Sequence, residues 1–112
     1  MSRAMPDVER SLAFGSVGAS FTDIGTPITR NYYLHWLQNL TDATVEFSWD
    51  GADNVNLTLA PNTALVLDEA TNVALENAEP ANVAIGTQYK ARHTGVAPTE
   101  GSVKVNGEFI VL

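Results

Sequence analysis

The sequence predicts an all-β protein, a jelly-roll-like or related antiparallel β-sandwich that forms a single domain. Three observations support this prediction. Apolar and polar side chains alternate over much of the chain, which is the pattern of strands with one buried face. Turn-forming residues, among them eight glycines and five prolines, interrupt the alternation at short intervals. The length of 112 residues suits one hydrophobic core.

The clearest predicted element is a β-hairpin over residues 45–59. Val45, Phe47 and Trp49 alternate with polar residues and therefore share one face of a strand. Residues 50–54 (DGADN) are types that favour turns, and the alternation resumes over residues 55–59. We therefore expect two antiparallel strands joined by a polar loop.

Further strands are expected on both sides of this hairpin. Alternation predicts strands within residues 64–68, 83–92 and 102–112. The chain ends on four apolar residues, which we expect to be tied into the sheet instead of fraying. One or two short strands near the start are indicated by Leu12, Phe14, Phe21 and Ile24.

The expected organisation is a flexible N-terminal arm over residues 1–10 followed by the sandwich domain over residues 11–112. Seven or eight short strands with regular turns are typical of a sandwich or a jelly roll. No repeat of 20–50 residues is visible, which argues against solenoids and propellers.

Two segments leave alternatives open. Residues 31–40 (NYYLHWLQNL) place aromatic and leucine side chains at helical spacing, but their aromatic richness favours a strand. Residues 68–79 (DEATNVALENAE) fit either a short helix or an acidic loop, and we prefer the loop.

The charge balance excludes two classes of partner. Thirteen acidic residues face six scattered basic residues, which gives a formal charge of −7. Nucleic acids and anionic membranes attract clustered positive charge, so we expect the protein to bind neither. No run approaches the roughly 18 apolar residues of a membrane helix. The first residues do not read as a secretory signal, and the lack of cysteine fits synthesis in a reducing cytoplasm.

The sequence shows no pattern typical of an active site. The absence of cysteine excludes disulfides and thiol nucleophiles. His35 and His93 lack the spacing of metal ligands, and we expect both to be surface or interface side chains. The cluster at residues 50–54 offers oxygen ligands for calcium but lacks the closing glutamate of a calcium loop, so a polar turn is favoured. We expect no enzyme activity, no metal and no cofactor.

An aromatic band over residues 32–37 (YYLHWL) is bulky on both faces of its expected strand. One face of a sandwich strand meets the core and the other meets water. Tyrosine and tryptophan are also enriched where protein surfaces bind each other. The alternative is that these side chains fill the core. The residues predicted to form a protein interface are Tyr32, Tyr33, Trp36 and Trp49.

The order of short motifs resembles that of capsid decoration (cement) proteins of short-tailed bacteriophages. The motifs are RSLAFGSV, FTDIGTPI, NLTDATVEFSWDG, LAPNTALVLDEATN, AIGTQYKAR and the ending GSVKVNGEFIVL. The resemblance covers residues 10–112. It implies a jelly-roll-like fold, and a structural virion protein on the capsid surface that is synthesised in the bacterial host cytoplasm.

The resemblance also implies partners. Such a protein binds the major capsid protein of the phage head from outside and associates with itself as a homodimer or homotrimer. It stabilises contacts between neighbouring shell subunits. Two alternatives remain at this point: another virion accessory, such as a head–tail, tail or fibre subunit, and a carbohydrate-binding sandwich. In the second, exposed Trp36, Trp49 or the tyrosines would stack on sugar rings.

Overall fold

The computed structural model describes residues 3–69 and 83–111. In this part of the chain the elements are nine strands and one 3-10 helix at Phe14–Ser16. The strands are β1 (Arg3–Pro6), β2 (Arg10–Ala13), β3 (Thr22–Asp23), β4 (Leu34–Asn39), β5 (Val45–Ser48), β6 (Leu57–Leu59), β7 (Thr63–Asp68), β8 (Lys90–His93) and β9 (Ser102–Val111). None of the elements described is a helix long and apolar enough to cross a membrane.

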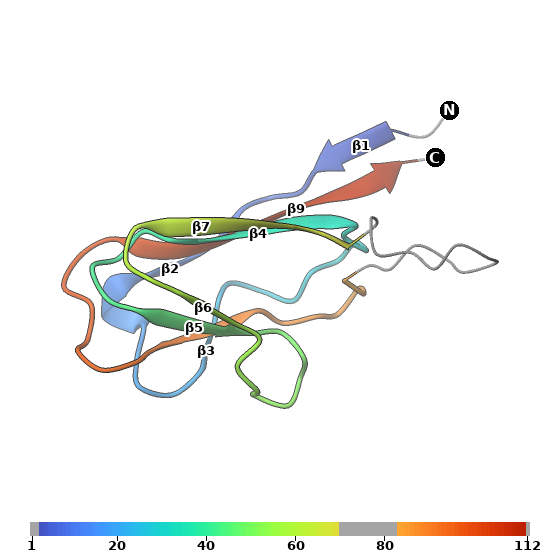
Figure 1. Ribbon diagram of the computed structural model, residues 1–112. Helices are drawn as coiled ribbons and strands as arrows, with labels where there is room; N and C mark the ends of the chain where they lie inside the picture. The colour runs from blue at the N-terminus through green and yellow to red at the C-terminus, as the bar shows by residue number, and fades with distance from the viewer. Residues whose placement is uncertain (1–2, 70–82, 112) are drawn as a thin grey trace.

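The strands form two antiparallel sheets that lie as two layers (Figure 1). The five-stranded sheet has the order β1-β9-β4-β7, with β2 also paired to β9, and the four-stranded sheet has the order β3-β8-β5-β6. The chain passes from one layer to the other between β2 and β3, β4 and β5, β6 and β7, and β8 and β9. The two-strand ribbon of β2 and β3 pairs with β9 and β8, and the ribbon of β4 and β5 pairs with β7 and β6. Nested ribbons of this kind make a jelly roll, which confirms the predicted fold class.

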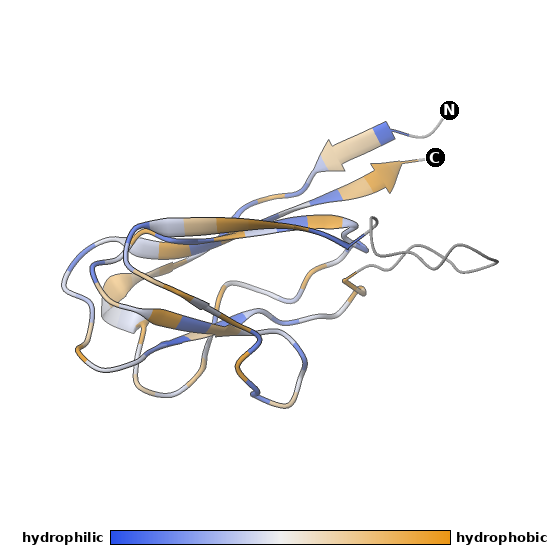
Figure 2. Cartoon of the chain, viewed as in Figure 1, coloured by the Kyte–Doolittle hydropathy of each residue, from blue (hydrophilic) through white to orange (hydrophobic). Residues whose placement is uncertain are grey.

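The core lies between the two sheets and is formed by apolar side chains of both layers. Hydrophobic and hydrophilic positions are interspersed along the strands of both sheets (Figure 2). The predicted hairpin is confirmed: its two strands pair antiparallel, with Val45 opposite Leu59 and Phe47 opposite Leu57. The interior is filled by inward-facing side chains in alternate positions. Those that are almost fully buried include Ile24, Ile28, Leu37, Val45, Phe47, Ala91, Val103 and Val105.

The structure resolves one open element, shortens a second and leaves most of a third outside the described residues. The open choice at residues 31–40 is resolved as a strand, because Leu34–Asn39 alternates between partly buried and buried positions. The strand expected over residues 83–92 is only partly correct: β8 begins at Lys90, after a turn in which Gly86 has φ +93°. That backbone region favours glycine and interrupts an extended strand. Most of the segment 68–79 lies outside the described residues.

The residues expected to form an N-terminal arm follow the edge of the five-stranded sheet. Arg3–Pro6 pairs with the end of β9, with Pro6 opposite Glu108. Arg10 then lies opposite Val105, so four steps along one strand match three steps along the other. The extra residue is a β-bulge, which locally breaks the ladder of this edge. β1 and the end of β9 project from the sandwich, close to both termini (Figure 1).

Candidate protein-binding surface

The aromatic residues predicted to form one interface lie in different environments. Tyr32 is only 1% exposed and belongs to the buried core cluster. Its backbone exchanges two hydrogen bonds with Val83, which brings its ring under the five-stranded sheet. Tyr32 therefore belongs to the core and offers no side-chain surface to a partner, contrary to the prediction. Tyr33, Trp36 and Trp49 are partly buried, and for them the interface role stays a prediction.

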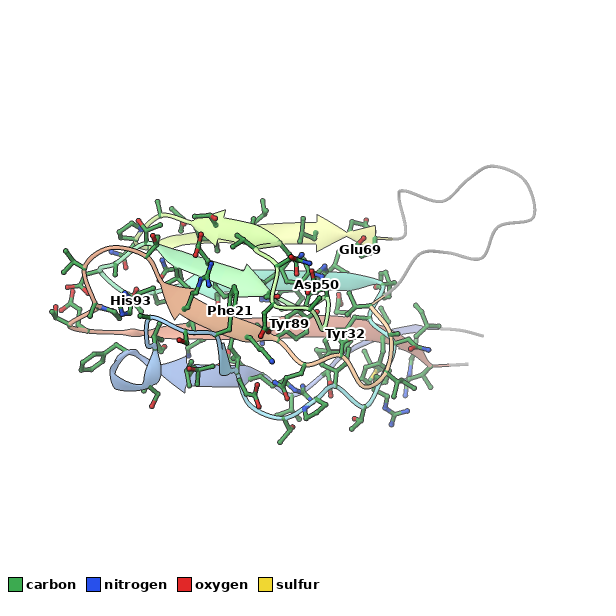
Figure 3. The ribbon with its side chains drawn as sticks, turned by 90° about the horizontal axis from the view of Figure 1, so that it is seen from below. Phe21, Tyr32, Asp50, Glu69, Tyr89 and His93 are labelled. Carbon is green, nitrogen blue, oxygen red and sulfur yellow. The ribbon has the colours of Figure 1, made fainter. Side chains whose placement is uncertain are left out.

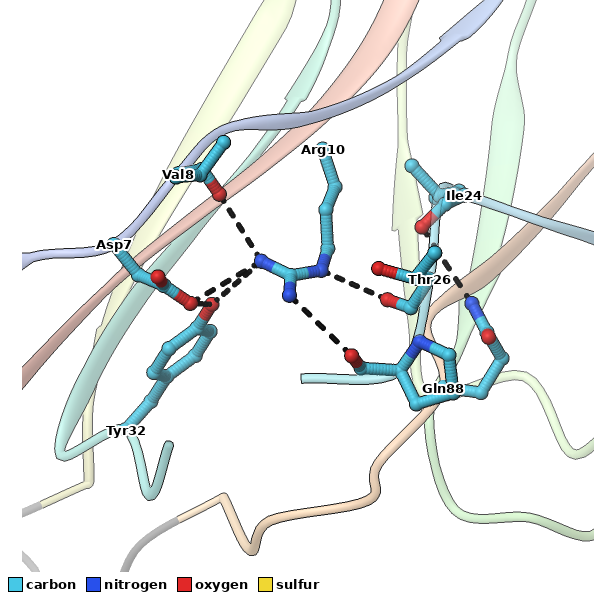
Figure 4. A network of polar contacts seen from close by, with 8 residues as sticks. Asp7, Val8, Arg10, Ile24, Thr26, Tyr32 and Gln88 are labelled. Carbon is cyan, nitrogen blue, oxygen red and sulfur yellow. Dashed lines mark hydrogen bonds and ion pairs between the residues drawn. The ribbon is translucent and has the colours of Figure 1, made fainter. Parts of the chain in front are cut away.

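The hydroxyl of Tyr32 is engaged in a network around Arg10 (Figure 4). It donates to Oδ2 of Asp7 at 2.5 Å and accepts from Nη1 of Arg10 at 3.0 Å. Arg10 also donates to the backbone oxygens of Thr26 at 2.8 Å and Pro27 at 3.3 Å. The guanidinium thus joins the N-terminal edge strand to the segment that leads into β4.

The charges in this network satisfy each other. Burial alone raises the pKa of Asp7, but hydrogen bonds from Tyr32 and the Val8 backbone, together with the charge of Arg10, bring it below its ordinary value. Burial and the hydrogen bond to Asp7 raise the pKa of Tyr32. At neutral pH the carboxylate is therefore charged and the phenol neutral, which is the state that the observed hydrogen bonds require.

A second closed cluster surrounds His35, whose side chain is fully buried. The hydroxyl of Tyr89 lies 2.9 Å from Nδ1, and Oε1 of Glu69 lies 2.9 Å from Nε2. The two partners, both labelled in Figure 3, together fit a neutral ring that accepts at Nδ1 and donates at Nε2. Burial lowers the pKa of His35, and the hydrogen bond and charge of Glu69 only partly oppose this. The expectation of a surface or interface imidazole is therefore wrong for His35, which is a core side chain.

Trp49 completes the cluster around His35. Its ring meets the His35 ring edge-on, with centroids 5.4 Å apart, and lies 5.8 Å from the Tyr89 ring. These contacts use a large part of the indole surface for packing between the layers. In the part of the chain that the structure describes, no group of three or more histidine, aspartate or glutamate side chains could hold a metal ion.

A hollow of about 370 Å³ lies between the hairpin loop and the turn before β8. Its polar side chains largely pair with each other. Asp50 accepts from the backbone of Ala52 at 2.8 Å, which together with Asn56 lowers the pKa of its carboxyl, and Asp53 lies 3.2 Å from Nζ of Lys90. The expected polar turn is confirmed. The residues lining the hollow are Ser48, Trp49, Asp50, Gly51, Asp53, Ile85, Gly86, Thr87, Gln88 and Lys90.

The outer face of the five-stranded sheet presents apolar side chains to the surroundings. Alternation along β4 points Leu34 and Trp36 away from the core, because His35 and Leu37 point into it. Trp36 lies directly opposite Val66 of β7, which is 60% exposed and follows outward-facing Ala64. We call these four residues (Leu34, Trp36, Ala64 and Val66) the outer apolar patch. The sequence pattern indicated Trp36 as an interface residue but not Val66, although the strand of Val66 carries the same alternation.

Comparison with known proteins does not assign the chain to a family. No family model matches the chain, and no curated protein matches it. Among solved structures, one match is the Dit protein of phage SPP1, described as a paradigm of hub adsorption apparatus in phages that infect Gram-positive bacteria. The identity is 9% and the TM-score 0.42, over 97% of this chain and 49% of that chain, so this chain spans about half of that protein's length. At this similarity the match identifies neither a shared fold nor a shared function.

Proposed function

We propose that the protein is a structural virion protein that decorates the outside of a phage head and stabilises contacts between major capsid protein subunits. One structural observation carries this proposal: the buried polar clusters around Arg10 and His35 are closed, whereas Trp36 and Val66 face outward on the five-stranded sheet. The polar side chains of these two clusters bond to each other and not to a ligand. An exposed apolar patch rimmed by polar residues is typical of a surface that binds another protein.

The chemistry of the outer apolar patch suits attachment to a shell. Tryptophan is the side chain most often found at energetic centres of protein interfaces, and Trp36 lies in the middle of its strand. Many identical copies on a symmetric shell turn modest individual affinities into strong overall attachment. The resemblance of the sequence motifs to phage decoration proteins supports the head as the location. It likewise supports the major capsid protein and further copies of this chain as the partners.

The first test of this proposal is the copy number in purified particles of the phage that encodes the protein. Quantitative mass spectrometry would compare it with the major capsid protein. A ratio equal to a simple fraction of the shell subunits is expected for a decoration protein. A few copies per particle would move the protein to a head–tail, tail or fibre position. Absence from the particle would overturn the virion role.

A matched pair of valine variants tests the binding surface. Val66→Ser shortens an apolar side chain in the outer apolar patch, whereas Val96→Ser makes the same change at an 82% exposed loop position. On shells that lack the protein, we expect Val66→Ser to bind about tenfold more weakly, because a buried methyl pair contributes about 1.4 kcal/mol or more. Val96→Ser should bind like the unmodified protein. Equal binding of all three proteins would contradict the assignment of the patch.

The hollow beside Trp49 favours carbohydrate binding as a second candidate function. Aromatic and carboxylate side chains line it, and these are the groups that recognise sugars. Against this candidate, the ring of Trp49 packs on His35 and Tyr89. Titration with neutral and acidic oligosaccharides, followed by tryptophan fluorescence, separates the two candidates. Saturable quenching that Trp49→Phe abolishes would favour sugar binding.

A further inference from the structure

The two sheets have four edges, and three of them are protected from pairing with another chain. In the four-stranded sheet the edge strands β3 and β6 have two and three residues. In the five-stranded sheet the edge formed by β1 and β2 carries Pro6 and the bulge. Short strands, proline and bulges are the devices by which proteins prevent edge-to-edge association.

The fourth edge, β7, has none of these devices. Thr63–Asp68 is six residues long, pairs regularly with β4 along its whole length, and contains no proline and no basic residue. Over residues 64–67 both of its sides are apolar. Ala64 and Val66 lie on the outer side, and Leu65 and Leu67 lie on the inner side. Leu65 is 38% exposed although it faces the interior, because no described strand covers it from the side.

The backbone of β7 also offers hydrogen-bonding groups along this edge. Glu69, directly after β7, donates its backbone N–H to the oxygen of Tyr33 at 2.9 Å. Backbone groups of alternate residues point to the same neighbour in an antiparallel sheet. Leu65 and Leu67 therefore face β4, whereas Ala64 and Val66 direct their N–H and C=O groups outward.

We propose that this edge pairs with the same edge of a second copy of the chain, antiparallel, about a two-fold axis at Leu65. In this register Ala64 lies opposite Val66 of the partner subunit, and the four outward backbone groups of these two residues are all bonded. Leu65 meets Leu65 of the partner subunit in a non-hydrogen-bonded pair, where Cβ atoms approach to about 4.5–5.5 Å. The axis is perpendicular to the sheet. Outward-facing side chains of both copies therefore lie on the same face of the joined sheet, and the two outer apolar patches become continuous.

The uncharged, nearly symmetric sequence of residues 63–67 favours a second copy of the chain as the occupant. The chain carries a formal charge of −7, so two copies repel each other unless they meet at an uncharged surface. Residues 63–67 (TALVL) contain no charged side chain, and the proposed register places Thr63 opposite Leu67 of the partner subunit. No carboxylate within this stretch faces another. The apolar pattern is also nearly symmetric about Leu65, as a two-fold axis requires.

The dimer deepens the proposed function because it presents two copies of Trp36 on one continuous face, but it does not depend on that function. All of its tests use the free protein, so their outcome is separate from that of shell binding. A dimer that fails to bind shells would refute the decoration role alone. A monomer that binds shells would refute the dimer alone.

The first experiment measures mass in solution by sedimentation equilibrium. The unmodified protein should have twice its chain mass of 12.0 kDa. Val66→Pro removes an outward N–H that β4 does not use, so circular dichroism should be unchanged while the mass falls to that of one chain. Val66→Ser keeps the N–H and should remain a dimer. A monomeric or trimeric unmodified protein, or a dimeric and folded Val66→Pro variant, would overturn the proposal.

The second experiment tests the register. The chain contains no cysteine, so Leu65→Cys introduces a single thiol at the proposed axis. Mild oxidation should give a disulfide-linked dimer on a non-reducing gel, because Cα atoms of a non-hydrogen-bonded pair lie about 4.5 Å apart, within the roughly 4.4–6.8 Å that a disulfide spans. Val96→Cys places a thiol at the exposed loop position and should remain uncrosslinked at the same protein concentration. A solution dimer in which Leu65→Cys crosslinks no faster than Val96→Cys would overturn the proposed axis.

Discussion

The two edges of the five-stranded sheet are built in opposite ways. The edge formed by β1 and β2 is held by Arg10, whose guanidinium joins Asp7, Tyr32 and two backbone carbonyls behind the strand. The β7 edge is largely apolar and exposed, and Glu69, which directly follows it, bonds His35. The first edge therefore depends on interactions within the chain, whereas the second is free to interact outside it.

This difference indicates where the protein tolerates substitutions. Substitutions behind the β1–β2 edge leave buried polar groups without partners, which costs stability. Outward substitutions on β7 alter surface area and leave the core intact. A surface that binds a partner can evolve at such an edge without loss of the fold.

The largest expected effect comes from Gly107, which β9 places against the Tyr32 ring. A Cβ at this position would lie 2.2 Å from Cδ2 of Tyr32. The ring cannot move easily, because its hydroxyl is bonded to both Asp7 and Arg10. We expect Gly107→Ala to lower the free energy of unfolding by about 3 kcal/mol or more, measured by urea denaturation.

Gly15→Ala is the matched control for Gly107→Ala, because a Cβ at Gly15 has no atom within 4 Å. Its stability should stay within about 0.5 kcal/mol of the unmodified protein. Similar losses in the two variants would show that the packing of Tyr32 does not hold this edge.

The next largest effect is expected for Arg10→Gln. The ion pair with Asp7 has side chains that are only 10% and 14% exposed, and its loss leaves a largely buried carboxylate without its countercharge. We expect a loss of about 2–3 kcal/mol in thermal or chemical unfolding. Lys104→Gln, which removes the exposed pair with Glu9 on the same edge, should cost less than about 1 kcal/mol. Equal losses would remove the distinction between buried and exposed charge at this edge.

The smallest expected effect is a loss of stability at low pH, caused by His35, which bonds Glu69 directly after β7. The folded-state pKa of His35 is lowered, so the folded protein favours the neutral ring. Below the ordinary histidine value of about 6.5 the unfolded chain binds a proton first, and stability falls as pH decreases from there through the folded pKa. Asp7 has a lowered pKa as well, so its contribution is lost only at more acid pH.

His35→Gln tests this assignment. Urea denaturation at pH 7.5 and pH 5.5, two values on either side of about 6.5, should show a loss of stability for the unmodified protein and a smaller loss for the variant. Each unit of difference between the folded and unfolded pKa corresponds to about 1.4 kcal/mol. The same pH dependence in both proteins would place the responsible group elsewhere.

Strands with clear alternation were predictable, because period two is a local property of the chain. The hairpin around Val45 and Phe47, the strand through Leu65 and the C-terminal strand through Val103 are all found where the sequence predicts them. The turn before β8 was missed, because Gly86 adopts a positive φ within an apparently extended pattern.

The aromatic band shows where local information ends. Tyr32 and Trp36 are similar in sequence terms, yet one is in the core and the other faces outward. The difference arises because Tyr32 lies before β4 begins and pairs instead with Val83, which is distant in the sequence. Nothing near Tyr32 in the sequence indicates this partner.

The class of the protein follows from local sequence patterns: an acidic, cysteine-free chain of short alternating strands needs two packed sheets to bury its apolar faces. Which polar groups are closed off, and which edge is open, depends on the three-dimensional arrangement of the strands. The partners of His35 are 34 and 54 residues away, and those of Arg10 include residues 16 to 22 positions away. Such contacts depend on the order of strands in the sheets, and that order results from packing of the whole chain.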